Sequence, residues 1–389
     1  MDVSDFTFEL PDDLIAQEAA PRGTSRLLVL DRQTPSLHHS TIRNLPMFLR
    51  SGDLLVVNNT RVFAARLLGH RVPSGGVVEC FLLGPSSAPD TTGAPVASGT
   101  LAPSHPGTPG TLAPWHPGTP GTPGTPGPPG TLFDALMHPG QKLKPGARVR
   151  FEGDAGVLMG EVVARHFHGR RTIRLWADGG ADIDTLVDAL GHVPLPPYIK
   201  RADTVADRER YQTVYASARG SVAAPTAGLH FTPELLSQLE SSGIERAEIT
   251  LHVGYGTFKP VRVERVEDHV VDPERYEISP SAADAIVKAK DSGRRIIAVG
   301  TTTTRALEDA AIRGGGRVAP GPGVATTFIY PGHTFRIIDG LLTNFHLPAS
   351  SLLMLVAACA SRARVLDAYR EAVEQRYRFY SYGDAMLIT

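Results

Sequence analysis

A proline- and glycine-rich repeat at residues 85–131 sets the strongest limit on how this chain can fold. Residues 99–109 read GTLAPSHPGTP, residues 110–120 read GTLAPWHPGTP, and the shorter GTPGTPGPPGTL follows. Because proline lacks an amide donor and glycine loses much backbone entropy on ordering, this composition forms neither a packed helix nor a central strand. Glycine does not recur at every third residue throughout, which excludes a collagen repeat. We predict a surface loop of low complexity, to which we assign no function.

Short apolar segments on either side of the repeat have the pattern of strands. They are β-branched or alternating, and they are bounded by glycine and proline. These segments lie at residues 77–83, 147–152, 160–167 and 172–177. Short strands separated by turns predict a small barrel or sandwich over about 66–178, in which the repeat connects two strands.

The remainder of the chain alternates between strand-like and helix-like segments. We expect a helix to begin at Thr232, whose hydroxyl can cap it ahead of Pro233, and to end at Gly243. Further strands are expected at 52–60, 247–253, 294–300, 326–330 and 335–339, and further helices at 305–312, 350–361 and 364–378. This alternation predicts an α/β domain over residues 1–65 and 179–389, with the barrel inserted at 66–178.

The charges of the chain nearly cancel, because 39 basic and 40 acidic residues give a formal net charge of -1. A nucleic-acid partner would therefore be held by local patches. Cys80 and Cys359 share no ligand-like spacing, so we expect neither a disulfide nor a metal site. Residues 1–10 do not resemble a leader peptide, and the most apolar run, 352–360, has about half the length of a membrane span. We expect a soluble, cytoplasmic protein with no membrane partner.

The segment AAPTAGLHF at 223–231 places a hydroxyl and an imidazole among small residues. Thr226 and His230 are its polar side chains, and the small neighbours let a ligand approach the main chain closely. The alternative is a tight turn ahead of the helix at Thr232, with His230 merely packed. On this segment alone the two interpretations carry about equal weight.

Two further segments place a histidine after an apolar run. In TLHVGYGTF, His252 precedes Gly254 and Gly256, whose amides are placed to line a pocket at the end of a strand. In LLTNFHLP, Asn344 and His346 follow a similar run. A single histidine is more often structural, and GxG occurs in many turns. Three such segments in one domain shift the balance toward a site.

The segment AVGTTTTRALE at 298–308 puts four threonines at the turn between a strand and a helix. Helix N-termini attract anions and nucleotide oxygens through unpaired amides, so we expect substrate contacts from Thr301, Thr302 and Arg305. The segment matches neither the Walker A nor the GxGxxG pattern, which disfavours ATP hydrolysis and dinucleotide redox chemistry. Glu308 in the first turn is expected only to offset the helix dipole.

Polar and basic residues gather at two other places. After the strand at 52–60, Asn58, Asn59 and Thr60 are candidate substrate contacts, because amide side chains can read a base edge. In the C-terminal segment, arginines alternate with aromatic residues, as single-stranded RNA binding requires; the alternative is an amphipathic helix with a solvated face. Extended aromatic segments at 194–201 and 211–216 are typical of loops that border a site. Our candidate RNA contacts are Arg61, Arg66, Arg376, Arg378, Tyr380 and Tyr382.

Taken together, these motifs resemble a known family. In chain order they read FELPDDLIAQ, SRLLVLDR, GDLLVVNNTRV, PLPPYI, RYQTVYA, VAAPTAGLHF, TLHVGYGTFKPV, AVGTTTTRALE, FIYPG, TNFHLP and YRFYSYGDAM. They are similar to those of the S-adenosylmethionine:tRNA ribosyltransferase-isomerases of queuosine biosynthesis. The resemblance covers residues 5–388, apart from the repeat and weaker stretches of the barrel. It implies an α/β main domain with an inserted six-stranded antiparallel β-barrel.

The resemblance also implies a reaction. The sugar of S-adenosylmethionine would be transferred to 7-aminomethyl-7-deazaguanine at the wobble position of a tRNA with a GUN anticodon. It would isomerise to give epoxyqueuosine, while adenine and methionine leave. S-adenosylmethionine is then a consumed substrate, so no cofactor is expected, and we expect a monomer.

This chemistry needs a base beside the sulfonium, an acid for the departing adenine and a neutral amine as nucleophile. His230 and His252 are our first candidates for proton transfer, because histidine titrates near neutrality. Thr226, Asn344 and His346 are expected to position the reacting groups.

The chain departs from the family pattern at several positions. Asp272 stands where the family tends to have a second histidine after His269, which puts in doubt any proton transfer assigned to that position. Ala64 replaces a proline, and Phe133 replaces a tryptophan at the end of the repeat. The repeat has no family counterpart, so we expect deletion of residues 86–129 to leave activity intact.

Two other classes of function stay open. A methyltransferase would release S-adenosylhomocysteine instead of adenine and methionine, but the usual glycine-rich loop is missing near residues 52–60. A non-catalytic RNA-binding module would bind tRNA without S-adenosylmethionine, and it would leave the three histidine segments without a purpose.

Overall fold

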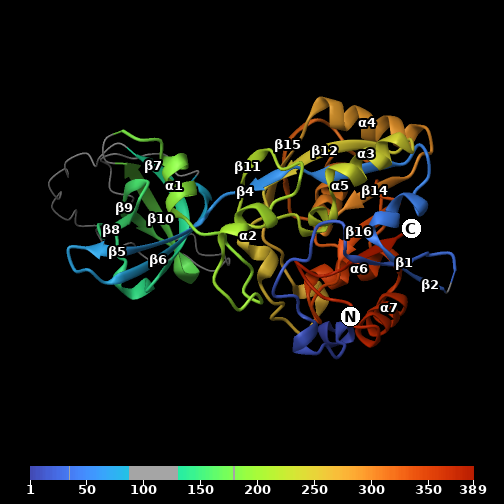
Figure 1. Cartoon of the computed structure of the whole chain (residues 1–389), viewed down its shortest axis with the longest axis horizontal. Helices are drawn as coiled ribbons and strands as arrows, with labels where there is room; N and C mark the ends of the chain where they lie inside the picture. Colours follow the sequence, from blue (N-terminus) through green and yellow to red (C-terminus); the bar gives the residue numbers. More distant parts are fainter. Residues whose placement is uncertain (35, 87–129, 178–179) are drawn as a thin grey trace, which may run out of the picture.

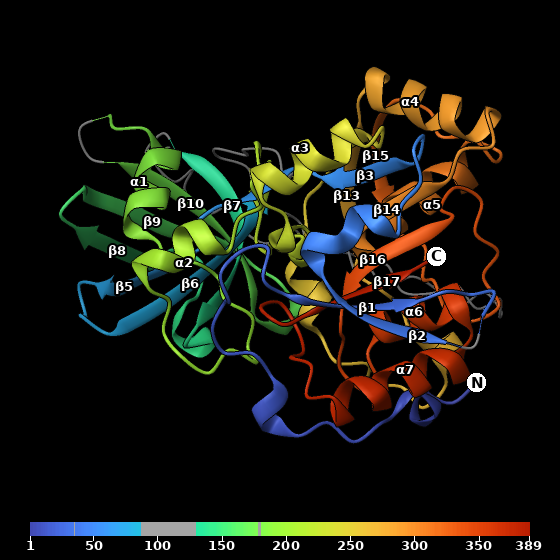
Figure 2. The ribbon, with the colours of Figure 1, turned by 45° about the vertical axis from the view of Figure 1, so that its right-hand side comes forward.

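The computed structural model describes residues 1–34, 36–86, 130–177 and 180–389. The chain forms a closed β-barrel and a larger part in which helices pack on a mixed sheet (Figure 1). Figure 2 shows that helices lie on both sides of this sheet, while the barrel stands beside it. The predicted α/β domain with an inserted barrel is therefore confirmed.

A nine-stranded sheet forms the centre of the larger part, with the strand order β15-β13-β12-β3-β14-β16-β17-β1-β2. Neighbouring strands β12, β3, β14 and β16 run parallel, and β17 reverses direction beside β16. Parallel strands buried on both faces read as continuous apolar runs, as β3 does. The strands are β1 (Arg26–Leu30), β2 (Leu37–Thr41), β3 (Leu54–Asn58), β12 (Glu245–Leu251), β13 (Glu274–Ile278), β14 (Ile296–Val299), β15 (Gly321–Ala325), β16 (Gly340–Asn344) and β17 (Ala385–Ile388).

Helices cover both faces of the sheet, and alternate residues of each strand face them. Leu54 and Val56 of β3 pack with one set of helices, and Leu55 and Val57 pack with the other. The first set is α4 (Pro280–Asp291), α5 (Thr301–Arg313), α6 (Ser351–Ala360) and α7 (Arg362–Glu374). The second face is covered by α3 (Pro233–Ser241) and a 3-10 segment (Ile42–Met47). As predicted, the Thr232 hydroxyl caps α3 by accepting from the amide of Leu235.

The barrel closes six antiparallel strands in the order β10-β7-β6-β5-β8-β9. They are β5 (Arg66–Val72), β6 (Val77–Pro85), β7 (Thr131–His138), β8 (Arg148–Gly153), β9 (Gly156–Arg165) and β10 (Arg170–Ala177). Leu186 and Val187 of α1 (Ile183–Leu190) complete its core. The repeat lies between the paired strands β6 and β7, and the prediction of a loop there falls outside the described residues.

Three short elements lie between the barrel and the sheet. Strand β4 (Thr60–Val62) pairs in parallel with β11 (Ala218–Ser221), and α2 (Val205–Arg210) lies nearby in Figure 1. Across the described ranges, no helix is both long and apolar enough to cross a membrane.

Two of the predicted strands are wrong. Residues 326–330 follow β15, and residues 335–339 precede β16. Neither segment has regular structure. The backbone amides of Thr326 and Thr327 donate to the buried carboxylate of Asp309, at 2.9 and 3.2 Å. The amides of residues 336–338 donate to the neighbouring carboxylate of Glu308. The buried side chains of Ile329, Ile337 and Ile338 give these segments a strand-like apolar pattern, but two α5 carboxylates take the amides that a strand would use.

Candidate active site

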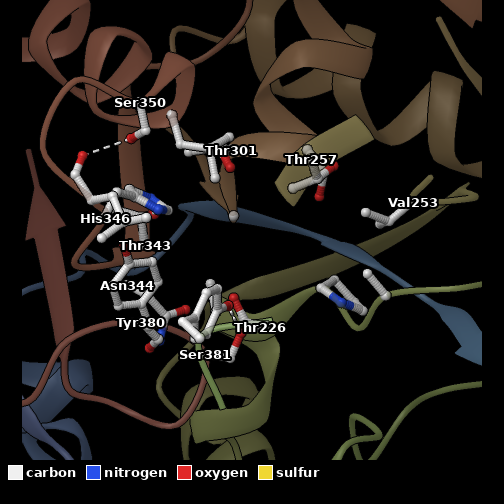
Figure 3. A pocket seen from close by; sticks show the side chains of 18 of the residues that line it. Thr226, Val253, Thr257, Thr301, Thr343, Asn344, His346, Ser350, Tyr380 and Ser381 are labelled. Carbon is white, nitrogen blue, oxygen red and sulfur yellow. Dashed lines mark hydrogen bonds between the residues drawn. The ribbon is translucent and has the colours of Figure 1, made fainter. Parts of the chain in front are cut away.

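A cavity of about 210 Å³, the first cavity, lies beyond the carboxyl ends of the parallel strands β12, β14 and β16. Open α/β sheets commonly bind ligands at this edge. Figure 3 shows side chains from several segments arranged around one central space. The wall includes residues 223–227, 259–261, 300–302, 346–350 and 380–381.

The turn from β14 to α5 forms one side of the first cavity. Gly300 has a φ of 92°, a conformation that favours glycine, and α5 begins there without a side-chain cap. Thr301 and Thr302, both predicted to contact substrate, line the cavity at the helix N-terminus. The first amides of a helix lack partners within it, so this side of the cavity presents hydrogen-bond donors.

Asn344, at the end of β16, presents an unsatisfied acceptor. Its amide nitrogen donates to the backbone carbonyl of Tyr380 at 3.1 Å and lies 3.1 Å from Nε2 of His230. Asn344 lines the first cavity, and its Oδ1 is buried without a hydrogen-bond partner in the described part of the chain. A buried acceptor without a partner costs free energy, which a ligand donor would recover.

His346 lines the first cavity, whereas His230 lies behind its wall. Nε2 of His346 is 2.8 Å from the Thr343 hydroxyl, and burial lowers the pKa of His346 to about 3. Burial and three nearby arginines lower the pKa of His230 to about 4. Both rings are therefore neutral and weakly basic at pH 7, so each serves as a fixed hydrogen-bonding group, and His346 is the one that faces the cavity.

Tyr380 forms another side of the first cavity. Its backbone has a φ of 73°, and its hydroxyl is buried with no partner among the described residues. The ring packs against Tyr198, with centroids 4.0 Å apart, and the Tyr198 hydroxyl is 2.5 Å from that of Ser381. All three residues line the cavity, together with the predicted Thr226.

A second cavity of about 600 Å³ adjoins the first, and Thr257, Lys259 and Thr301 line both. Its wall carries many ionisable side chains: Lys259, Arg262, Asp268, His269, Asp272, Glu274 and Arg305. Lys259 donates to Asp272 at 2.6 Å. Gly256 also lines this cavity, and a Cβ there would lie 2.4 Å from the Asp272 carboxylate.

Arg305 lines the second cavity, but its donors are already used. It donates to Glu274 at 2.8 Å and to the backbone carbonyls of Asp272, Ala325 and Thr327. Burial raises the pKa of Glu274, and the charge of Arg305 opposes that rise. The predicted substrate contact is thus an internal ion pair that fixes the cavity wall.

Besides His230, five predicted site residues line neither cavity. Both amide atoms of Asn58 bond to backbone groups, and Asn59 bonds to Glu248 and Thr250. Nδ1 of His252 lies 3.1 Å from the Thr60 hydroxyl, beside β4. These side chains join the end of β3 to β12. Their role in the structure is therefore to hold these strands in place. Gly254, a fifth, donates its amide to Glu274 at 3.1 Å.

Of the candidate RNA contacts, the arginines lie at or near the surface. Arg61 is exposed on β4. Arg66 pairs with Glu79 at 2.7 Å, and Arg376 pairs with Asp13 at 2.5 Å. Arg378 is half-buried, 3.9 Å from the carboxylate of Asp384.

The two tyrosines are buried, which corrects the expectation that they present rings for stacking at the surface. Tyr382 donates to Asp207 at 2.9 Å, and Tyr380 lines the first cavity. The reason is that this segment turns inward after α7 and leads directly into β17 inside the sheet.

Sequence reasoning missed several wall residues, namely Tyr198, Thr257, Lys259, Ser350 and Ser381. The aromatic segment at 194–201 was a usable signal for Tyr198. Thr257 and Lys259 lie in the motif TLHVGYGTFKPV, Ser381 lies in YRFYSYGDAM and Ser350 begins a predicted helix, but only tertiary packing brings these side chains to one wall. Within the described ranges, no group of three His, Cys, Asp or Glu residues is placed to hold a metal ion.

Comparison with known proteins shows which family the chain belongs to. It is 47% identical to the S-adenosylmethionine:tRNA ribosyltransferase-isomerase of Heliobacterium modesticaldum and 44% identical to that of Desulfitobacterium hafniense, over 100% of both chains in each case. A crystal structure of an S-adenosylmethionine tRNA ribosyltransferase from Thermotoga maritima is 32% identical, covers 99% of this chain and 100% of that chain, and has a TM-score of 0.49. A family model described as queuosine biosynthesis protein matches residues 3–388. The chain therefore belongs to the queuosine biosynthesis protein family.

Proposed function

We propose that this chain transfers and isomerises the ribosyl group of S-adenosylmethionine onto 7-aminomethyl-7-deazaguanine at the wobble position of tRNA. The sugar loses its bonds to sulfur and to adenine and one bond to its ring oxygen. It gains a bond to the exocyclic amine, a carbon–carbon bond that closes the five-membered carbocycle and a new carbon–oxygen bond of the epoxide. Of the two protons lost, from the carbon beside sulfur and from the amine, one goes to adenine and one to solvent. Epoxyqueuosine, adenine and methionine are the products, and no oxidant or reductant is needed. S-adenosylmethionine is consumed as a substrate, and no other cofactor takes part.

The observation that carries this proposal is full-length identity of 44–47% to relatives named for this activity, joined to the cavities described above. The two adjoining cavities together have the size of a pocket for a small organic ligand. Unused acceptors and a helix N-terminus surround the first cavity, while charged groups surround the second. A nucleoside joined to an amino acid has both kinds of chemistry.

His346 takes the place of His230 and His252 as the histidine proposed to contact the substrate. It is the one of the three histidines that lines the first cavity, and the low pKa leaves it neutral at pH 7. A neutral imidazole can hydrogen-bond to a ligand, whereas His230 is not among the described residues that line the cavity. Thr226 and Asn344 position the substrate.

The test is a product analysis with purified protein, S-adenosylmethionine and a GUN-anticodon tRNA that carries the aminomethyl-deazaguanine. Mass spectrometry of the digested nucleosides should show epoxyqueuosine, with adenine and methionine released in equal amounts. The control is the same tRNA with guanine at the wobble position, which should release neither product. Release of S-adenosylhomocysteine would indicate a methyltransferase, and tRNA binding without turnover would indicate a binding module.

The proposed tRNA surface includes Arg61 and the arginine pairs near the barrel and the C-terminal segment. The wobble base must leave the anticodon stack to reach a buried site. We propose that one chain is sufficient for activity, which light scattering of the active fraction would test.

A further inference from the structure

The two adjoining cavities differ in charge. Among the described residues that line the first cavity, Lys259 is the charged one, and it is paired with Asp272. The rest of that wall is apolar or neutral, with alanine, proline, threonine and tyrosine side chains. The second cavity has basic and acidic groups from six side chains besides His269. A neutral ring therefore fits the first cavity, and a zwitterion fits the second.

The orientation of the Asn344 amide follows from its partners. The Tyr380 carbonyl can only accept, so the atom 3.1 Å away is the Asn344 nitrogen. That nitrogen also donates to His230, whose Nε2 must then be the unprotonated ring nitrogen. Nδ1 of His230 carries the proton and donates to the Ser25 hydroxyl at 2.8 Å. Oδ1 of Asn344 is left as an acceptor at the wall of the first cavity.

The electrostatic surroundings of His230 keep this arrangement in place. Burial is the largest cause of its lowered pKa, and the charges of Arg378, Arg210 and Arg22 add to it. A protonated His230 would present an N–H to the Asn344 nitrogen, which cannot accept. The neutral ring holds the amide so that a ligand meets an oxygen and not an amino group.

We propose that the first cavity binds the adenine ring of S-adenosylmethionine, that Oδ1 of Asn344 accepts a hydrogen bond from the adenine amine, and that His230 positions Asn344. The amino-acid end then lies toward the second cavity. This inference rests on the proposed function. Adenine is favoured over the tRNA base, because that base brings phosphates and the first cavity offers no unpaired cation among its described residues.

Adenosine and purine riboside, which differ in the exocyclic amine, test the proposal by calorimetric titration. Both are titrated into the free protein and into protein saturated with tRNA that carries guanine at the wobble position. Wild type should bind adenosine about tenfold more tightly or better, since purine riboside leaves a buried acceptor unpaired. Asn344→Leu should bring the ratio of the two affinities close to one. The matched control Asn44→Leu, at an exposed amide on the 3-10 segment (Ile42–Met47) outside both cavities, should keep the wild-type ratio.

The role of His230 is tested by two variants. His230→Phe removes the acceptor and should abolish the preference for adenosine, whereas His230→Gln supplies an oxygen near the Nε2 position and should retain it. A purely structural role would change the melting temperature without changing the ratio. If His230→Phe does not fold, the remaining two variants still test the proposal. His230→Gln should keep the preference for adenosine, and Asn344→Leu should lose it.

Wild-type protein that binds both nucleosides equally, or neither, contradicts the inference. So does an Asn344→Leu variant that keeps the preference for adenosine. If epoxyqueuosine forms but the protein does not prefer adenosine over purine riboside, the adenine site is wrong and the proposed function is retained. A clear preference without product formation overturns the function and leaves the adenine site standing.

Discussion

His346 differs from the other two histidines because its ring lines the cavity. The expected result of His346→Asn is a loss of turnover of about 10- to 10²-fold, the size expected when one buried hydrogen bond to the substrate is lost. Binding of tRNA should not change. Single-turnover assays with saturating S-adenosylmethionine provide the measurement. The matched variant His252→Asn, at a ring bonded to Thr60 outside both cavities, should stay within a few-fold of wild type. Equal losses in both variants would contradict the assignment.

The same burial makes stability depend on pH. Unfolded histidine has a pKa near 6.5, whereas His230 titrates at about 4 and His346 at about 3 in the folded chain. The unfolded chain therefore gains protons that the folded chain cannot take as the pH falls below 6.5. Stability from these two residues is present above pH 6.5 and is lost toward pH 4, by up to roughly 1.4 kcal/mol per pH unit for each.

Urea unfolding at pH 7, 6, 5 and 4 measures this dependence. A His230→Gln/His346→Gln double variant should show a flatter decline between pH 6.5 and 4 than wild type. Buried carboxylates with lowered pKa add their own loss as the pH falls below about 5. Burial alone would raise the pKa of Asp207, for example, but hydrogen bonds from Arg201 and Thr204 outweigh it and hold that pKa well below its usual range. An unchanged decline in the double variant would show that other groups cause it.

At the scale of elements, α5 organises the segment that follows it through two adjacent carboxylates. Glu308 accepts three backbone amides of residues 336–338 and is fully buried. Glu308→Gln should lower the free energy of unfolding by about 1–3 kcal/mol, because the new amide group turns a donor toward backbone donors. Glu374→Gln on the exposed end of α7 should change it by less than about 0.5 kcal/mol. Denaturant unfolding of both variants tests this, and equal stabilities would contradict it.

The connection between β6 and β7 gives a second prediction for an element. Pro85 pairs with Phe133, so deletion of residues 86–129 leaves residues 130–132 as a three-residue hairpin loop, a common length. The barrel core should stay closed, and turnover should stay within about twofold of wild type because the cavities are formed by other segments. Circular dichroism and the product assay measure the two outcomes. A folded deletion variant without activity would assign the repeat a role.

At the scale of the whole molecule, near-zero net charge means that tRNA must be bound by local basic residues. Arg61→Ala should weaken tRNA binding and reduce the slope of log affinity against log salt by about one. Arg317→Ala, at a surface residue paired with Asp291, is the control and should keep the wild-type slope. Filter binding from low to moderate salt gives both slopes. An unchanged slope for Arg61→Ala would remove this residue from the tRNA surface.

The layer architecture and many of its elements follow from sequence because local chemistry determines them. The apolar run before Asn58 is a strand buried on both faces, and Thr232 with Pro233 begins α3. Alternation and turns predicted the barrel in the same way. This reasoning failed for residues 326–330 and 335–339. Buried side chains give the same apolar pattern whether the backbone amides bond to a neighbouring strand or to a carboxylate.

The sequence by itself determined the α/β architecture, the barrel and the family, and it placed Asn344, His346 and Thr226 among the candidates. Only the tertiary structure decided that His346 faces the cavity while His230 supports Asn344 from behind. The reason is that His230 meets Ser25, which is 205 residues away in the chain, and Asn344, which is 114 residues away. Residue type sets what an imidazole is able to do, whereas packing between distant segments sets which atoms it reaches.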